Sequence, residues 1–126
     1  MAAALPWVAA AELERPLVAT SPLYKVIFDE RFPASVAFAN QAQRQGLPVH
    51  AIRGDVTSLW FHDLDLRWKQ GPAAIAGLTD PNALFCLDLL ARDKGMRVAS
   101  CEPRPGGLVA WVISPRAIAP RTSTKL

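Results

Sequence analysis

The order of strand and helix signals near the start of the patterned part of the chain constrains the fold most. Tyr24–Phe28 is a β-branched and aromatic run of strand length. The apolar positions from Pro33 to Gln45 predict a helix that ends at Gly46, and Leu47–Ile52 is a second short apolar run. This spacing is typical of a βαβ unit, in which a helix joins two parallel strands.

The remainder of the sequence continues the alternation of helices and strands. The predicted elements are a helix between Asp55 and Pro72, a strand at Ala73–Leu78, a helix from Asp80 to Lys94, and strands at Met96–Cys101 and Leu108–Ile113. The last two strands are separated by a short turn-rich segment, so they are expected to form an antiparallel hairpin.

These elements predict an α/β fold, a small three-layer α/β/α domain. Its sheet is expected to be mostly parallel, with about five strands and an antiparallel C-terminal hairpin. We expect an apolar arm or signal remnant and a linker at residues 1–22, a single α/β domain at 23–114, and a flexible tail at 115–126. A hydrophobic content of 51% in 126 residues fits one packed core.

The first eleven residues, MAAALPWVAAA, have two interpretations. An apolar run that ends in small residues is typical of the end of a secretion signal, although the basic front part of such a signal is missing. The same residues would also serve as an apolar arm that packs on the domain or on a second copy. Because a membrane span needs about 20 apolar residues, this run is too short to be one.

Several function classes find no support in the sequence. The net charge is only +3, and the arginines are spread along the chain, so nucleic-acid binding is not expected. No dinucleotide or P-loop motif occurs, and we expect no cofactor. Cys86, Cys101, His50 and His62 lack the spacing of a metal site. The two cysteines would pair in an exported protein or be small buried residues in a cytosolic one, and the second interpretation is favoured.

The predicted sheet places the candidate ligand-binding residues. Ligands of open parallel sheets bind beyond the carboxyl ends of the strands, and the loops that follow the first three strands should meet there. The candidates are Arg31, Arg53, Thr79 and Asp80, of which the arginines would hold a carboxylate or phosphate. The simpler alternative is that Asp29, Asp55, Thr79 and Asp80 cap helices and that both arginines are solvated.

The remaining site candidates are His62 and Asp63, in the stretch Ser58–Gly71, and Asp55 just before it. His62, with Asp63 or Asp55, is a weak candidate for a catalytic acid–base pair, since a carboxylate raises the pKa of an imidazole. The favoured alternative is a helix with a solvated polar face of His62, Asp65 and Lys69. Its packing face is expected to contain Leu59, Phe61, Leu66 and Trp68. The alternating D-L-D-L pattern also predicts a break near Asp63 that would lift His62 and Asp63 into a loop.

Three stretches carry a loose family resemblance over about three fifths of the chain. They are D-V-T-S-L-W at 55–60, G-P-A-A-I-A-G-L-T at 71–79 and L-F-C-L-D-L-L-A-R-D-K-G-M-R-V at 84–98. In these the chain resembles an uncharacterised group of small bacterial exported proteins with a twin-arginine type signal. The twin-arginine motif itself is absent from this sequence. The resemblance implies a periplasmic location, with a cytoplasmic one as the alternative, and it brings no activity.

Three hypotheses for the function follow. The first is a noncatalytic α/β module that binds a small anionic ligand or a protein partner at the rim formed by the three loops. The second is a small hydrolase or isomerase that uses His62 with Asp63 or Asp55. The third is a structural protein that forms a homo-oligomer by burying Trp7 of the apolar arm against a second copy.

Overall fold

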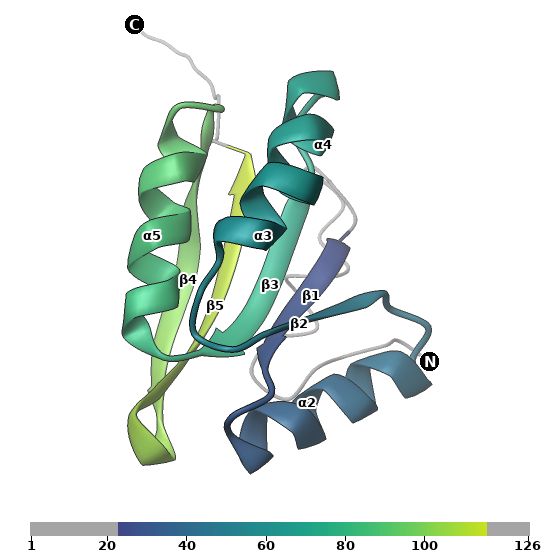
Figure 1. The fold of residues 1–126 in the computed structure, drawn as a ribbon, viewed down its shortest axis with the longest axis vertical. Coiled ribbons are helices and arrows are strands. Elements are labelled where there is room, and N and C mark those ends of the chain that lie inside the picture. The colour runs from purple at the N-terminus through teal and green to yellow at the C-terminus, as the bar shows by residue number, and fades with distance from the viewer. Residues whose placement is uncertain (1–22, 116–126) are drawn as a thin grey trace, which may run out of the picture.

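A computed structural model describes residues 23–115 (Figure 1). The elements in chain order are β1 (Leu23–Asp29), α2 (Pro33–Arg44), β2 (Val49–Ile52), α3 (Thr57–Leu59), the π-helical segment η1 (Trp60–Leu64), α4 (Asp65–Gln70), β3 (Ala74–Thr79), α5 (Pro81–Arg92), β4 (Met96–Arg104), the 3-10 turn η2 (Pro105–Gly107) and β5 (Leu108–Pro115). The apolar arm predicted at 1–22, with its Trp7, and the tail after Pro115 lie outside the described residues.

The five strands form one mixed sheet in the order β2-β1-β3-β5-β4. β1 is parallel to both β2 and β3, whereas β5 is antiparallel to both β3 and β4. The predicted α/β fold, the five strands and the C-terminal hairpin are therefore confirmed. The prediction of a mostly parallel sheet is wrong, because β5 inserts between β3 and β4 and makes two antiparallel pairings instead of one.

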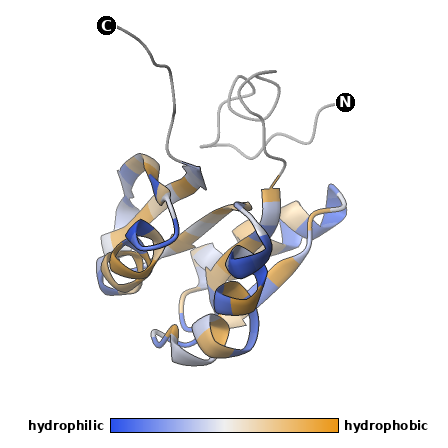
Figure 2. Ribbon diagram, turned by 90° about the horizontal axis from the view of Figure 1, so that it is seen from above, coloured by the Kyte–Doolittle hydropathy of each residue, from blue (hydrophilic) through white to orange (hydrophobic). Residues whose placement is uncertain are grey.

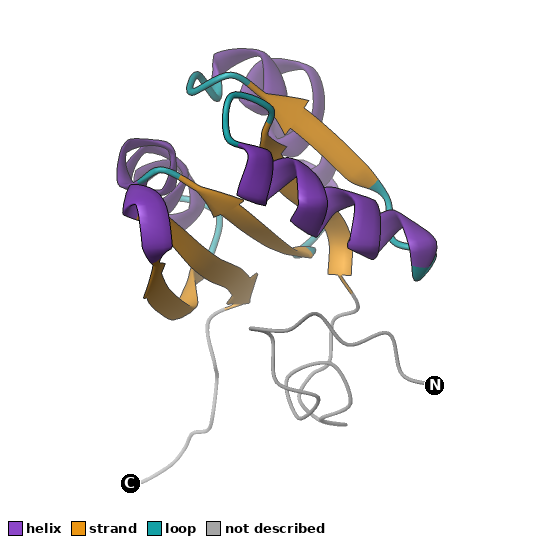
Figure 3. Ribbon diagram, turned by 90° about the horizontal axis from the view of Figure 1, so that it is seen from below, coloured by secondary structure: helices purple, strands orange, loops and turns teal. Residues whose placement is uncertain are grey.

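Side chains that alternate along the strands divide the core between the two faces of the sheet. Ile27 and Trp111 belong to a cluster with apolar residues of α3, η1, α4 and α5. Their chain neighbours Val26 and Val112 belong to a second cluster, to which α2 contributes Phe38. Since successive residues of a strand point to opposite faces, α2 packs on one face and the other helices pack on the opposite one (Figure 3).

The helical run α3–η1–α4 does not break near Asp63, but it widens there into the π-helical segment η1. Its buried residues are Leu59, Leu64 and Trp68, of which the first two are five positions apart. The wider turn rotates Phe61 and Leu66 outward, to exposed fractions of 61% and 54%. The packing face predicted for this helix is therefore wrong at these two residues. Figure 2 shows hydrophobic and hydrophilic bands on the helices.

Cys86 and Cys101 are both exposed and free, so the favoured interpretation of buried cysteines is wrong. Cys86 lies on the solvent side of α5, beside the exposed Phe85 and Leu89. The many leucines of α5 predict a well-buried helix that is apolar on more than half its circumference, but its buried residues are Ala83, Leu87 and Ala91, and Cys86 is not among them. No helix within residues 23–115 is long and apolar enough to cross a membrane.

Candidate functional site

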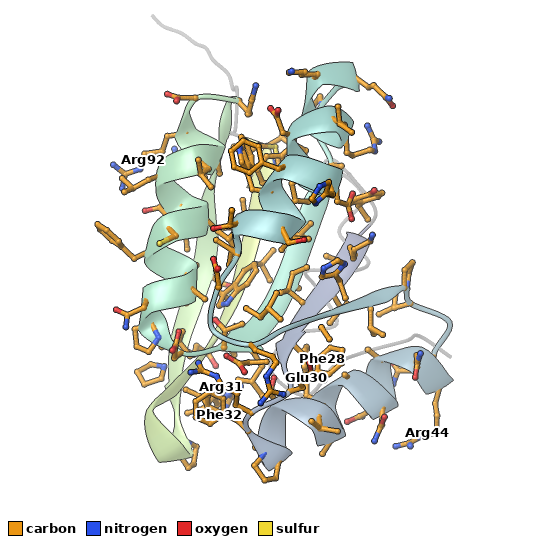
Figure 4. The ribbon with its side chains drawn as sticks, viewed as in Figure 1. Phe28, Glu30, Arg31, Phe32, Arg44 and Arg92 are labelled. Carbon is orange, nitrogen blue, oxygen red and sulfur yellow. The ribbon has the colours of Figure 1, made fainter. Side chains whose placement is uncertain are left out.

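The ends of β1, β2 and β3 meet at one side of the sheet, as the βαβ pattern predicted. This rim is formed by the loops after Asp29, Ile52 and Thr79. Arg31 lies in the first loop, beside the start of α2 (Figure 4). It contacts Asp80 of the third loop, so the structure brings two of the four predicted ligand-binding residues together.

An ion pair between the buried Asp29 and the partly exposed Arg31 occupies the centre of the rim. The carboxylate of Asp29 is fully buried and accepts hydrogen bonds from the Arg31 backbone N–H at 3.0 Å and from Arg31 Nη2 at 2.8 Å. Arg31 Nη2 also donates to Asp80 Oδ2 at 3.1 Å. Burial alone would raise the pKa of Asp29, but the hydrogen bonds from Arg31 outweigh it and lower that pKa. Hydrogen bonding to Asp29 in turn raises the pKa of Arg31.

Thr79, the third predicted ligand-binding residue, is fully buried beneath this ion pair. Its hydroxyl accepts a hydrogen bond from Trp111 Nε1 at 3.0 Å and donates to the carbonyl of Asp80 at 2.9 Å. The hydroxyl of Ser35 likewise donates to the Leu78 carbonyl at 2.6 Å. These hydroxyls satisfy buried polar groups, and the fully buried Thr79 is not part of the rim surface. The sequence analysis missed both Ser35 and Trp111, because each lies far along the chain from its partner.

Arg53, the fourth predicted residue, is largely exposed and lies 3.6 Å from the Glu30 carboxylate. The neighbouring Gly54 has a positive φ of 85°, and a Cβ there would lie 2.7 Å from the Arg31 guanidinium. The turn therefore requires glycine for backbone conformation and for close approach. The rim carries four carboxylates, of Asp29, Glu30, Asp55 and Asp80, against two arginines, and so has two excess negative charges.

Of the four residues in the capping alternative, only Asp80 caps a helix, because the N-cap positions of α2 and α3 are Phe32 and Val56. Asp80 is the N-cap of α5 and accepts a hydrogen bond from the Ala83 backbone N–H at 2.9 Å. Asp55 accepts bonds from the backbone N–H and the hydroxyl of Thr57, at 2.9 and 2.7 Å, at the start of α3. These bonds to Thr57 lower the pKa of Asp55. Asp29 differs from both, because its carboxylate accepts hydrogen bonds from Arg31 and not from the backbone at a helix start.

The residues proposed as an acid–base pair, His62 and Asp63, point to different partners. His62 Nδ1 lies 3.3 Å from the hydroxyl of Ser58, one helical turn away on the exposed surface. Asp63 instead faces β1, where it accepts hydrogen bonds from the hydroxyl of Tyr24 at 2.5 Å and from the amine of Lys25. Within residues 23–115 the side chain of His62 has no carboxylate partner.

Asp63 is the centre of a polar cluster that sequence reasoning missed. Burial would raise the pKa of Asp63, but hydrogen bonds from Lys25 and Tyr24 outweigh it and lower that pKa. The hydrogen bond to Asp63 raises the pKa of Tyr24. Burial, and then the charge of Lys25, lowers the pKa of His50 on the neighbouring strand β2. No local motif marks this cluster, because the π-helical segment and the register of two strands bring it together.

A hollow of about 430 Å³ lies away from the rim, between α5 and the start of β4. The residues that line it are Asp88, Arg92, Gly95, Met96, Arg97 and Val98. Arg92 is paired with Asp88 through Nη2 at 2.8 Å. The exposed side chain of Arg97 has no hydrogen bond or ion pair with any residue from 23 to 115. The sequence offered one signal for this residue, a single arginine in an otherwise apolar strand.

Comparison with known proteins does not identify the chain. No protein-family model matches the sequence, and no curated protein or solved structure is significantly similar to it. The resemblance to small exported proteins therefore stays a prediction.

Among residues 23–115, no group of three or more His, Cys, Asp or Glu side chains is placed to hold a metal ion.

Proposed function

We propose that this domain is a noncatalytic binding module, and that its ligand carries a carboxylate or phosphate group that binds in the hollow between α5 and β4. The observation that carries the proposal is Arg97, an arginine that lines the hollow and has no partner among the described residues. Guanidinium groups bind carboxylates and phosphates through two parallel hydrogen bonds. Alternation along β4 directs the Arg97 side chain to the face of the sheet opposite α5, so its free donors would meet such a ligand where the hollow reaches the edge of β4.

Arg92 supports the same site from the opposite wall. Its guanidinium is exposed and is paired with Asp88 across one turn of α5. Exposed pairs of this kind contribute little to stability, so an incoming anion would compete with Asp88 at small cost. Together the two arginines and one aspartate give the hollow one excess positive charge. The hollow is open to solvent, so a charged ligand could enter it from the surface.

The rim, where the sequence first placed an anionic ligand, is the competing location. There the Arg31 guanidinium is bonded to two carboxylates, and the surrounding charges are negative in excess. An anion at the rim would have to displace Asp29 or Asp80 from Arg31. Arg53 is the only rim arginine with a weak partner, so it is the residue by which the rim hypothesis is tested.

A noncatalytic function is favoured by the positions of the proposed acid–base residues. His62 bonds to Ser58, and Asp63 is held by Tyr24 and Lys25, so the two do not form the pair that catalysis would need. We also propose that the domain has the three-layer α/β/α arrangement, which is supported by core clusters on both faces of the sheet.

The test is an NMR titration of the full chain with sodium acetate and with sodium phosphate at constant ionic strength. We expect shifts of the Arg92 and Arg97 amides, and Arg97→Ala should weaken the affinity about tenfold or more. Arg44→Ala is the matched control, because Arg44 is also an exposed arginine without a partner among the described residues, but it lies at the far end of α2 (Figure 4).

The same titration of Arg53→Ala separates the rim from the hollow. If Arg53→Ala weakens binding and Arg97→Ala does not, the ligand binds at the rim. If Arg44→Ala and Arg97→Ala weaken binding equally, the anions interact with arginines in general, and the proposed site in the hollow is rejected.

A further inference from the structure

The strand β4 has a free edge beside the hollow. It is the last strand in the sheet order, so one of its edges has no strand neighbour among residues 23–115 (Figure 1). The backbone N–H and C=O groups of such an edge are a template for pairing with another extended chain. The other edge strand, β2, is only four residues long, whereas β4 has nine.

Three features protect the second half of this edge from pairing with another strand. The register of β4 on β5 shifts at Ala99, between Val98 and Ser100, which is the mark of a β-bulge. Further along, Pro103 lacks a backbone N–H, and Glu102 is paired with Arg104 at 3.1 Å. Bulges, prolines and charges are the usual protection of edge strands. Met96–Val98, which precedes the bulge, contains no proline, and its one charged side chain is that of Arg97.

This open part of the edge is the part that lines the hollow. Met96, Arg97 and Val98 form its β4 wall, and Arg92 lies on the α5 wall. Val98 packs against the core cluster beneath α5 and pairs with Ile113, so alternation directs Arg97 to the opposite face of the sheet. The two arginines therefore lie on opposite sides of the sheet, beside the part of β4 that lines the hollow.

Apolar side chains continue this surface along α5. Leu84 and Val98 are partly buried against the core, while Phe85 has an exposed fraction of 62%. Phe85 and Arg92 are seven positions apart on the helix and so lie on the same side of it. A ligand placed at the edge would therefore meet backbone hydrogen-bonding groups, apolar contacts and two guanidinium groups together.

We propose that the Met96–Val98 edge and the hollow bind the carboxyl-terminal end of an extended peptide from a partner protein. The peptide adds to β4 as a short strand, and its terminal carboxylate lies between Arg92 and Arg97. This inference rests on the proposed anion site and names its ligand. Only three residues of β4, Met96–Val98, are available for pairing, because a longer added strand would meet the bulge at Ala99. So short a pairing segment fits the end of a peptide chain better than its middle.

The probe for the test is an acetylated hexapeptide of alternating threonine and valine with a free terminal carboxyl group. Added to the 15N-labelled full chain, it should shift the amides of Met96–Val98 and Arg92. Two matched peptides isolate the two contacts: one ends in an amide instead of the acid, and the other carries methyl groups on alternate backbone nitrogens. We expect each change to weaken binding about tenfold.

The protein variants complete the design. Arg97→Ala should weaken binding of the acid peptide and leave the amidated peptide unchanged, and Arg44→Ala should alter neither. If acetate shifts these amides and the peptide binds no more tightly than acetate, strand addition is rejected while the anion site stands. If neither shifts them, both proposals fall. If the same amides shift with protein concentration alone, the edge pairs with a second copy, and the peptide proposal is overturned.

Discussion

The rim and the hollow each contain two arginines. Both rim arginines are paired with carboxylates, whereas one arginine of the hollow has no hydrogen-bond or ion-pair partner among the described residues. At the rim, Arg31 is bonded to Asp29 and Asp80 at 2.8 and 3.1 Å, and Arg53 lies 3.6 Å from Glu30. In the hollow, Arg97 has no partner within residues 23–115. The presence of arginine at the end of a strand therefore does not by itself indicate an anion site. What matters is whether the fold already uses its hydrogen-bond donors.

The difference has a physical origin in what lies beneath each region. The rim covers the fully buried Asp29, Ser35 and Thr79, whose polar groups must be satisfied without water. A buried carboxylate requires a cation, so Arg31 is committed to the fold. Within residues 23–115 these three are the only buried polar or charged residues and none of them lines the hollow, so the side chain of Arg97 is free to serve a ligand.

The largest effect expected from this comparison is on stability. Asp29→Ala leaves the Arg31 backbone N–H and guanidinium without their main acceptor, and we expect a loss of about 3 kcal/mol in the free energy of unfolding. The lower end of the usual range applies, because Arg31 is itself 38% exposed and can reach water. Urea unfolding followed by circular dichroism gives the measurement.

Arg97→Ala is the counterpart in the hollow, and it should leave the urea midpoint unchanged. Asp29→Asn keeps an acceptor for the Arg31 N–H and should fall between wild type and Asp29→Ala. Equal losses for Asp29→Ala and Arg97→Ala would contradict the view that one region serves the fold and the other does not.

Much of the fold was predictable because its signals are local. The proline at the start of α2, the capping Asp80 and the glycine after α5 mark helix ends within a few residues of where they occur. The mostly parallel sheet was wrong for the opposite reason. Whether β4 or β5 lies against β3 depends on contacts between segments distant in sequence. A local sequence pattern does not predict such contacts.

The candidate site was predictable in its position but not in its chemistry. The sequence placed Arg31, Thr79 and Asp80 at one rim, and they lie there. The sequence did not reveal that Asp29 is buried, because Asp29 resembles an ordinary turn residue in sequence. Its burial depends on the third loop, where Asp80 contacts Arg31. The sequence also did not reveal that the Asp63 side chain faces β1. The π-helical segment η1 changes which side of the helix each residue faces, and no sequence pattern marked that segment.

Gly54→Ala tests how closely the rim is packed around Arg31. A residue with a Cβ costs about 1 kcal/mol at the positive φ of this turn. The new methyl group would also lie 2.7 Å from the Arg31 guanidinium and would push it away from Asp29. Gly106→Ala is the control, because Gly106 has a similar φ and no atom within 4 Å of its Cβ position. We expect a clearly lower melting temperature for Gly54→Ala than for Gly106→Ala; equal values would mean that the Arg31 contact contributes nothing.

The smallest effect concerns the polar cluster around Asp63, which resembles the rim in having its charges already paired. Burial and Lys25 lower the pKa of His50 in the folded state, so the unfolded chain binds a proton more readily. This contribution to stability is complete above the unfolded pKa, about 6.5, and is lost as the pH falls through that value toward the folded pKa. Asp63 adds nothing to the change in this range, because its lowered pKa keeps it charged.

Urea unfolding at pH 7.5 and at pH 5.5 should therefore show a lower stability at the acidic pH. His50→Gln should reduce this difference, because the neutral side chain takes up no proton in either state. His62→Gln, which replaces an exposed imidazole on the helix surface, should retain it. If His62→Gln and His50→Gln reduce the difference equally, the pH dependence does not come from the buried cluster. The contrast between paired and free charges would then hold for the rim and the hollow, but not for the polar groups around Asp63.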